Sequence, residues 1–181
     1  MEATVIWITG LSGSGKTTIA RRLVEMLKER GEKPVLIDGD EIRDAIRDPS
    51  TAHDRDSRIQ NALRICRLTE LLSSQGFMVI VATMSLFKEV HEWNRSHFPS
   101  YFEVYLDVRL DVLRKRHPHD LYTLAEQGKT ADVAGIDLAF DRPLNPHLVL
   151  PNDSEGGVDE AAQKILGRLG SSLPGFGSKG E

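Results

Sequence analysis

Glycine, lysine and hydroxyl residues near the start of the chain have the types and the spacing that bind a row of phosphates. The segment fits the pattern G-x-x-x-x-G-K-[ST] and runs Gly10, Leu11, Ser12, Gly13, Ser14, Gly15, Lys16, Thr17, with Thr18 next to it. Glycines let backbone N–H groups turn inward around phosphates, and a helix start adds partial positive charge. We expect Lys16 to reach the β- and γ-phosphates of a nucleoside triphosphate and the Thr17 hydroxyl to bind Mg²⁺. The alternative is a chance glycine turn with an exposed lysine.

Two carboxylates follow the next expected strand. Asp38 and Asp40 have Gly39 between them, so in an extended segment both side chains point the same way, toward the phosphates. One could organise the water shell of Mg²⁺ while the other accepts the proton of an attacking hydroxyl group. The alternative is a turn at the end of a strand that carries two solvated carboxylates.

The phosphate-binding pattern requires a strand before it and a helix after it, and the sequence supplies both. Thr4–Thr9 is β-branched and aromatic, and Lys16–Glu29 has apolar residues at helical spacing. Further strands are expected at Pro34–Ile37, Phe77–Thr83, Tyr101–Asp107 and Leu148–Leu150, and further helices at Ser57–Ser74, around Phe87–His97 and at Glu160–Leu169. This alternation predicts an α/β protein with the P-loop NTPase fold, in which a mostly parallel sheet has helices on both faces and ligands at the carboxyl ends of its strands.

The length of 181 residues is typical of one domain, which we expect to cover residues 1–169. The segment His117–Asp137 has no strong period and contains Gly128 and Gly135, so we predict a mobile lid at about 117–137. Residues 170–181 are rich in glycine and serine, and we expect them to be disordered.

Composition argues against several classes of partner. The formal net charge of −4 is unusual for proteins that bind nucleic acid or membrane surfaces. Cys66 is the only cysteine, so no intramolecular disulfide can form, and its place on an apolar helical stripe predicts core packing. The N-terminus lacks the basic region of a signal peptide, and the longest apolar stretch, Phe77 to Ala82, is far shorter than the ~20 residues that cross a bilayer. We therefore expect a soluble, cytoplasmic protein that acts on a small molecule.

The phosphate-binding pattern alone does not separate a kinase from a GTPase or a nucleotide-driven switch. The sequence has no Asn-Lys-x-Asp segment of the kind that reads guanine in GTPases. ATP is therefore the expected nucleotide, and phosphotransfer to an alcohol is favoured over a non-catalytic switch, which stays open as an alternative.

At the level of whole motifs, the chain resembles the adenylylsulfate (APS) kinase family from Val5 to Leu169. The likeness rests on Gly10–Thr18, Asp38–Arg43, the helix that carries Arg58, Asn61 and Arg64, Ser85 after a strand, Tyr105–Asp107, a lid with Leu121-Tyr122, Gly128 and Gly135-Ile136-Asp137, and Asn145-Pro146. The resemblance implies transfer of phosphate from Mg·ATP to the 3′-hydroxyl of adenosine 5′-phosphosulfate, a step of sulfate assimilation. It also implies a possible homodimer.

Roles for individual residues follow from the same resemblance. Asp40 would be the catalytic base beside Lys16, and Arg116 would lie against ATP. The acceptor would be held by Asp38, Asp40, Arg43, His53, Arg58, Asn61 and Ser85. The arginine fork suits oxyanions, although a solvated helix face would also explain these side chains. Ser85 occupies a serine position at which the family has a proposed phosphoserine intermediate, and a plain turn serine is the alternative.

The acceptor side departs from the family pattern. His53 and Val133 stand where the family usually has two phenylalanines that clamp the adenine of the acceptor, and valine offers no aromatic face. Ser57 replaces an acidic residue, and Thr123 and Leu124 replace lysines. These changes leave open a related kinase of another nucleotide metabolite, such as CDP-phosphoramidate, whose pyrimidine needs less aromatic surface. A sugar-acid kinase is a further alternative.

Overall fold

The core of the molecule is a five-stranded parallel sheet. The computed structural model describes residues 3–46, 54–116, 120–153 and 157–172. The strands are β1 (Val5–Gly10), β2 (Val35–Asp38), β3 (Val79–Thr83), β4 (Tyr101–Asp107) and β5 (Leu148–Pro151), in the order β2-β3-β1-β4-β5. Thr9 of β1 lies opposite Thr83 of β3 and Tyr105 of β4, so the carboxyl ends of three central strands open on one edge. The predicted parallel α/β sheet is confirmed.

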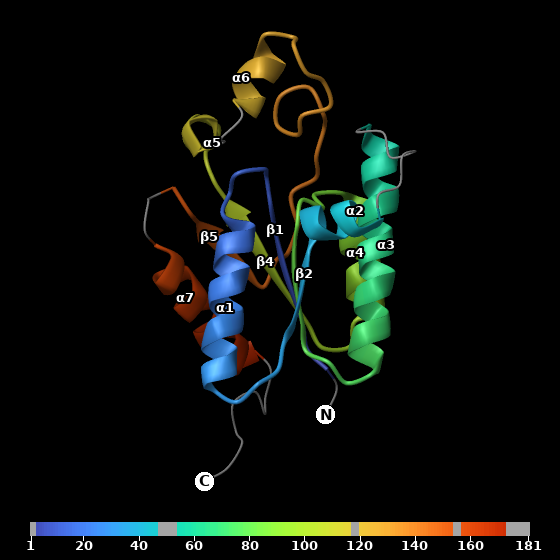
Figure 1. Ribbon diagram of the computed structural model, residues 1–181, viewed down its shortest axis with the longest axis vertical. Coiled ribbons are helices and arrows are strands. Elements are labelled where there is room, and N and C mark those ends of the chain that lie inside the picture. Colours follow the sequence, from blue (N-terminus) through green and yellow to red (C-terminus); the bar gives the residue numbers. More distant parts are fainter. Residues whose placement is uncertain (1–2, 47–53, 117–119, 154–156, 173–181) are drawn as a thin grey trace.

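Helices cover both faces of the sheet (Figure 1). Helices α1 (Lys16–Glu29) and α7 (Val158–Ser172) pack on one face, and α3 (Arg55–Ser74) and α4 (Lys88–His97) pack on the other. Each face has its own hydrophobic core, and alternate side chains of β1 point to opposite faces. Ile6 and Ile8 belong to the core under α1 and α7, the first core, whereas Val5 and Trp7 belong to the core under α3 and α4, the second core. Cys66 is buried in the second core, as its position on the helical stripe predicted.

The predicted lid segment, of which residues 120–137 are described, lies over the carboxyl edge of the sheet (Figure 1). Helix α5 (Leu110–Arg116) precedes it and α6 (Leu121–Glu126) lies at its start. Tyr122, Val133 and Ala134 are buried there against Leu11 of the phosphate-binding segment. The lid therefore packs directly on the nucleotide side of the sheet.

Several predicted boundaries need correction. The extended conformation predicted for Asp38 to Asp40 is wrong, because helix α2 (Gly39–Ile46) begins directly after β2. Strand β3 begins at Val79 rather than Phe77, whose ring is exposed. The disorder predicted from residue 170 is also misplaced at its start, since α7 continues to Ser172, and residues 173–181 lie outside the described ranges. Within the described part, no helix has the length and apolar character needed to cross a membrane.

A buried charged cluster joins α4 to β4. Glu103 of β4 is fully buried. Its Oε2 accepts a hydrogen bond from Arg95 Nη2 (2.5 Å), while its Oε1 accepts one from Tyr101 Oη (3.1 Å) and lies 2.9 Å from His91 Nδ1. Burial alone would raise the pKa of Glu103, but the bonds from His91 and Tyr101 and the charge of Arg95 outweigh it and hold that pKa below its ordinary value of 4.5. The carboxylate is thus kept ionised inside the fold.

Replacing Glu103 by glutamine should lower the free energy of unfolding by about 2 kcal/mol, because charge-assisted bonds to Arg95 and His91 are lost in a buried site. Denaturant unfolding at pH 7 measures this. A group with a depressed folded pKa stabilises above its unfolded pKa, so the deficit should shrink as the pH falls below 4.5. Glu92→Gln removes an exposed carboxylate of α4, the helix that carries His91 and Arg95, and should leave the stability unchanged. Equal effects of the two variants would contradict the prediction.

Candidate active site

The segment from Gly10 to Thr17, here called the phosphate loop, connects β1 to α1 as the sequence predicted. Gly13 (φ 77°) and Gly15 (φ 93°) adopt left-handed backbone conformations that residues with a Cβ reach only at a cost. Ser12, Gly13, Gly15, Lys16, Thr17 and Thr18 line a cavity at the edge of the sheet. Gly10, Leu11 and Ser14 support the loop from the buried side.

Lys16 supplies the cationic group on the phosphate-loop side of this cavity. Its Nζ donates to the Leu11 carbonyl oxygen at 2.8 Å. Burial lowers the pKa of Lys16 to about 8, although the carboxylates of Asp40 and Asp38 act in the opposite direction. The two carboxylates offset only part of the cost of burying this ammonium group, and the phosphates of a nucleotide can provide further negative charge.

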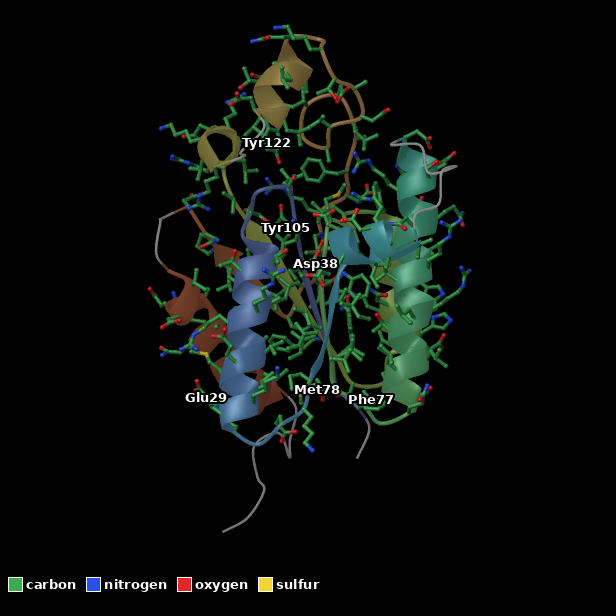
Figure 2. The ribbon with its side chains drawn as sticks, viewed as in Figure 1. Glu29, Asp38, Phe77, Met78, Tyr105 and Tyr122 are labelled. Atoms are coloured by element: carbon green, nitrogen blue, oxygen red, sulfur yellow. The ribbon has the colours of Figure 1, made fainter. Side chains whose placement is uncertain are left out.

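Asp38 and Thr17 place two oxygen-bearing side chains next to each other beside Lys16. Thr17 Oγ1 donates to Asp38 Oδ2 at 2.5 Å, and Asp38 Oδ1 accepts the backbone N–H of Asp40 at 2.9 Å and of Glu41 at 3.4 Å. Figure 2 shows Asp38 at the lid-facing end of the sheet, below Tyr122, whereas Glu29 and Phe77 lie at the opposite end. A hydroxyl and a carboxylate are ligands of the type that Mg²⁺ prefers. No group of three or more His, Cys, Asp or Glu residues that could hold a metal occurs in the described ranges.

Asp40 faces the same cavity from the first turn of α2. Its carboxylate is 84% exposed, and its Oδ1 accepts a hydrogen bond from Arg43 Nη1 at 3.0 Å, one turn further along the helix. The side chains of Asp38 and Asp40 therefore have different surroundings. Asp38 is buried and bonded through both oxygens, whereas Asp40 is open to whatever occupies the cavity.

The cavity has a volume of about 680 Å³ and lies between the sheet edge and the lid. Besides the loop residues, its lining consists of Asp38, Gly39, Asp40, Arg43, Arg58, Ala82, Thr83, Met84, Leu121, Tyr122, Thr130, Ala131, Val133 and Ala134. Arg58 Nη2 donates to the Asp132 carbonyl oxygen at 2.9 Å. Burial lowers the pKa of Arg58, and the nearby charge of Arg43 adds to that effect. Two cations that repel each other at one wall are suited to an anionic ligand.

Other residues of the predicted site lie elsewhere. Ser85 is fully buried, lies outside the cavity lining and accepts a hydrogen bond from Trp7 Nε1 at 2.9 Å. Asn61 lies on α3 three residues after Arg58 and is not part of the lining either. Arg116 ends α5 and donates to the Asn152 carbonyl oxygen. The prediction for His53 falls outside the described residues.

Sequence reasoning missed some residues that shape the site. Tyr122 Oη donates to the Ser12 carbonyl oxygen at 2.6 Å, and Asn152 Nδ2 donates to the Ser14 carbonyl oxygen at 2.9 Å. Both contacts join segments more than a hundred residues apart, so no local pattern could reveal Asn152. Tyr122 belonged to a family motif, but nothing in its neighbours indicated a bond to the phosphate loop.

Comparisons with known proteins place this chain among characterised kinases. The family model for adenylylsulphate kinase matches residues 2–151. A cytidine diphosphoramidate kinase of Campylobacter jejuni is 38% identical over 165 residues, which cover 91% of this chain and 95% of that protein. An adenylyl-sulfate kinase of Burkholderia ambifaria is 37% identical over 167 residues, covering 91% of each chain.

A solved structure gives the same answer for the fold. The APS kinase CysC of Mycobacterium tuberculosis, in complex with AMPPNP and APS, superposes with a TM-score of 0.84 and 31% identity over 93% of this chain and 98% of that one. The fold of this chain thus matches that of an APS kinase. This chain belongs to the adenylylsulphate kinase family and is an ATP-dependent phosphotransferase.

Proposed function

We propose that this enzyme transfers the γ-phosphoryl group of ATP to the 3′-hydroxyl of a nucleoside 5′-phosphoester, with APS as the first acceptor to test. The observation that carries the proposal is the shared cavity. Lys16 and Thr17 of the phosphate loop, the Asp40 carboxylate and the two arginines of the opposite wall all line the same space of about 680 Å³. Relatives named as adenylyl-sulfate kinases support the choice of acceptor.

The proposed roles follow from these surroundings. Lys16 and the backbone N–H groups of the phosphate loop hold the β- and γ-phosphates. The acceptor oxygen attacks the γ-phosphorus, the bond from that phosphorus to the β,γ-bridging oxygen breaks, and ADP leaves. Asp40 accepts the hydroxyl proton, while Arg43 and Arg58 bind the acceptor's 5′ anion. Thr17 directly, and Asp38 through water, would hold Mg²⁺, which neutralises charge on the β- and γ-phosphates.

A pyrimidine acceptor such as CDP-phosphoramidate is the second candidate. Val133 lines the cavity and is aliphatic, so the wall at this position offers no ring on which a purine could stack. The cytidine diphosphoramidate kinase of Campylobacter jejuni, at 38% identity, supports this candidate.

A coupled ADP-release assay against APS, CDP-linked compounds and gluconate tests the proposal. We expect turnover with at least one nucleotide and none with gluconate, and phosphorus NMR should locate the new phosphate on the 3′-oxygen. Turnover with gluconate alone would replace the proposal by a sugar-acid kinase. ATP binding without turnover of any acceptor would favour a non-catalytic nucleotide switch.

We also propose that the enzyme works in the cytoplasm as a homodimer, without nucleic-acid or membrane partners. The buried thiol of Cys66, whose pKa burial raises to about 12, is consistent with a protein that makes no disulfide. The net charge of −4 supports the absence of a nucleic-acid partner. Light scattering of the purified protein would measure its assembly state.

A further inference from the structure

The carbonyl groups of the phosphate loop need partners outside the nucleotide site. A loop that points its N–H groups at phosphates turns carbonyl oxygens the other way, and a partly buried carbonyl without a donor is costly. The Ser12 oxygen accepts from Tyr122 Oη of the lid. The Ser14 carbonyl oxygen accepts a hydrogen bond from Asn152 Nδ2 at 2.9 Å. Asn152 directly follows β5.

The bond from Asn152 controls more than one carbonyl. The Ser14 C=O and the Gly15 N–H belong to one planar trans peptide unit, so they point in opposite directions. Holding the oxygen from outside therefore directs the N–H inward. Gly15 has a φ of 93° and no Cβ to restrict rotation, and a Cβ built on it would lie 2.8 Å from Asn152 Nδ2. The amide of Asn152 thus packs against a peptide unit of the loop whose rotation no side chain at residue 15 restricts.

The segment that contains Asn152 is fixed at two points. Arg116, the last residue of α5, donates to the Asn152 carbonyl oxygen. The next residue, Asp153, accepts the backbone N–H of Arg109 at 3.0 Å, just before α5. The segment after β5 is therefore attached to both ends of α5. Of the two bonds, only that from Arg116 acts on Asn152 itself, so we expect the amide to keep its place when the Asp153 contact alone is removed.

We propose that Asn152 is a positioning residue that orients the Gly15 N–H toward the phosphates of the bound nucleotide. The inference rests on the proposed nucleotide site at the phosphate loop. Asn152 contributes no atom to the reaction, and it lies outside the lining of the cavity. Its effect should therefore fall on nucleotide affinity and leave acceptor affinity unchanged.

The test measures ADP binding by calorimetry in magnesium buffer, together with the KM values of ATP and of the active acceptor. Asn152→Ala should weaken ADP binding and raise the KM of ATP by about tenfold, with the acceptor KM unchanged. Asn152→Leu fills the same space without a donor and should show the same loss. Recovery of nucleotide affinity in the leucine variant would mean that packing, and not the hydrogen bond, is responsible, and would overturn the proposal.

Two further variants separate the possible failures. Asp153→Ala loosens the same segment but keeps the Asn152 amide, so its ADP affinity should stay within about threefold of the wild type. An equal loss in Asp153→Ala and Asn152→Ala would also overturn the proposal. Lys16→Met should lose ADP affinity if the nucleotide binds at this loop. If Lys16→Met loses affinity while Asn152→Ala keeps it, the positioning role fails and the nucleotide site stands; if neither loses it, the site itself is wrong.

Discussion

Replacing Lys16 by methionine is expected to lower kcat by about 10³-fold or more while leaving the protein folded. Methionine keeps most of the length and the apolar stem of lysine but cannot neutralise the charge that moves onto the β,γ-bridging oxygen and the leaving ADP. The exposed Lys88, which pairs with Glu92 on α4, provides a matched control, and Lys88→Met should keep full activity. The same ADP-release assay measures both variants. Full activity in Lys16→Met would refute the assignment of the phosphate loop.

The same replacement should stabilise the protein when no nucleotide is bound. The pKa of Lys16 is about 8 in the fold, against an ordinary value of 10.5, because burial disfavours the charged form. Between these two values the unfolded chain binds more protons than the folded one, so the wild type gains stability as the pH rises through that window. At pH 7 the folded protein must hold a poorly solvated ammonium group. Methionine removes that cost.

Denaturant unfolding without nucleotide at pH 7 and at pH 9.5 measures this second effect. The variant should be the more stable protein at pH 7, and its advantage should shrink at pH 9.5. Lys88→Met should show no such dependence, since that side chain is 66% exposed. A constant difference between wild type and Lys16→Met across the two pH values would show that burial does not depress this pKa.

The nucleotide side of the site could be predicted because its signals are local. The phosphate loop, the strand before it and the helix after it occupy consecutive residues, and the structure places them as expected. Helix α2 was missed because Asp38-Gly39-Asp40 resembles a turn. A usable signal was present, since Asp38 caps the helix and Glu41 stands three residues later, the spacing of a capping box.

The acceptor side was harder to predict because its geometry depends on tertiary contacts. Helix α6 has only six residues, too few to show a helical period, and the lid core is assembled from segments far apart in the sequence. Ser85 is buried and hydrogen-bonded to Trp7 and Thr9 of β1, a tertiary arrangement that no pattern around residue 85 reveals. The roles of Asn61, Arg116 and Ser85 in catalysis or binding stay predictions.

Replacing Asp40 by asparagine should lower kcat by about 10²- to 10³-fold, because the amide keeps the shape of the carboxylate but cannot accept the acceptor's proton. ATP affinity should change little, since the Asp40 carboxylate accepts its hydrogen bond from Arg43 of its own helix and not from the phosphate loop. Asp38 offers no substitute base, because its two oxygens are already bonded to Thr17 and to the start of α2.

Glu41→Gln is the matched control for Asp40→Asn. Glu41 follows Asp40 on the same helical turn and carries the same charge, but its carboxylate pairs with Arg21 on the outside of α1 and does not line the cavity. Loss of general negative charge near the site would affect both variants, whereas loss of a base affects only Asp40→Asn. Initial rates at saturating and limiting ATP separate kcat from nucleotide affinity. Two outcomes would remove Asp40 from the role of base: equal losses of kcat and ATP affinity in Asp40→Asn, or a similar loss of kcat in Glu41→Gln. The Asp40 carboxylate would then act only through its negative charge near Lys16.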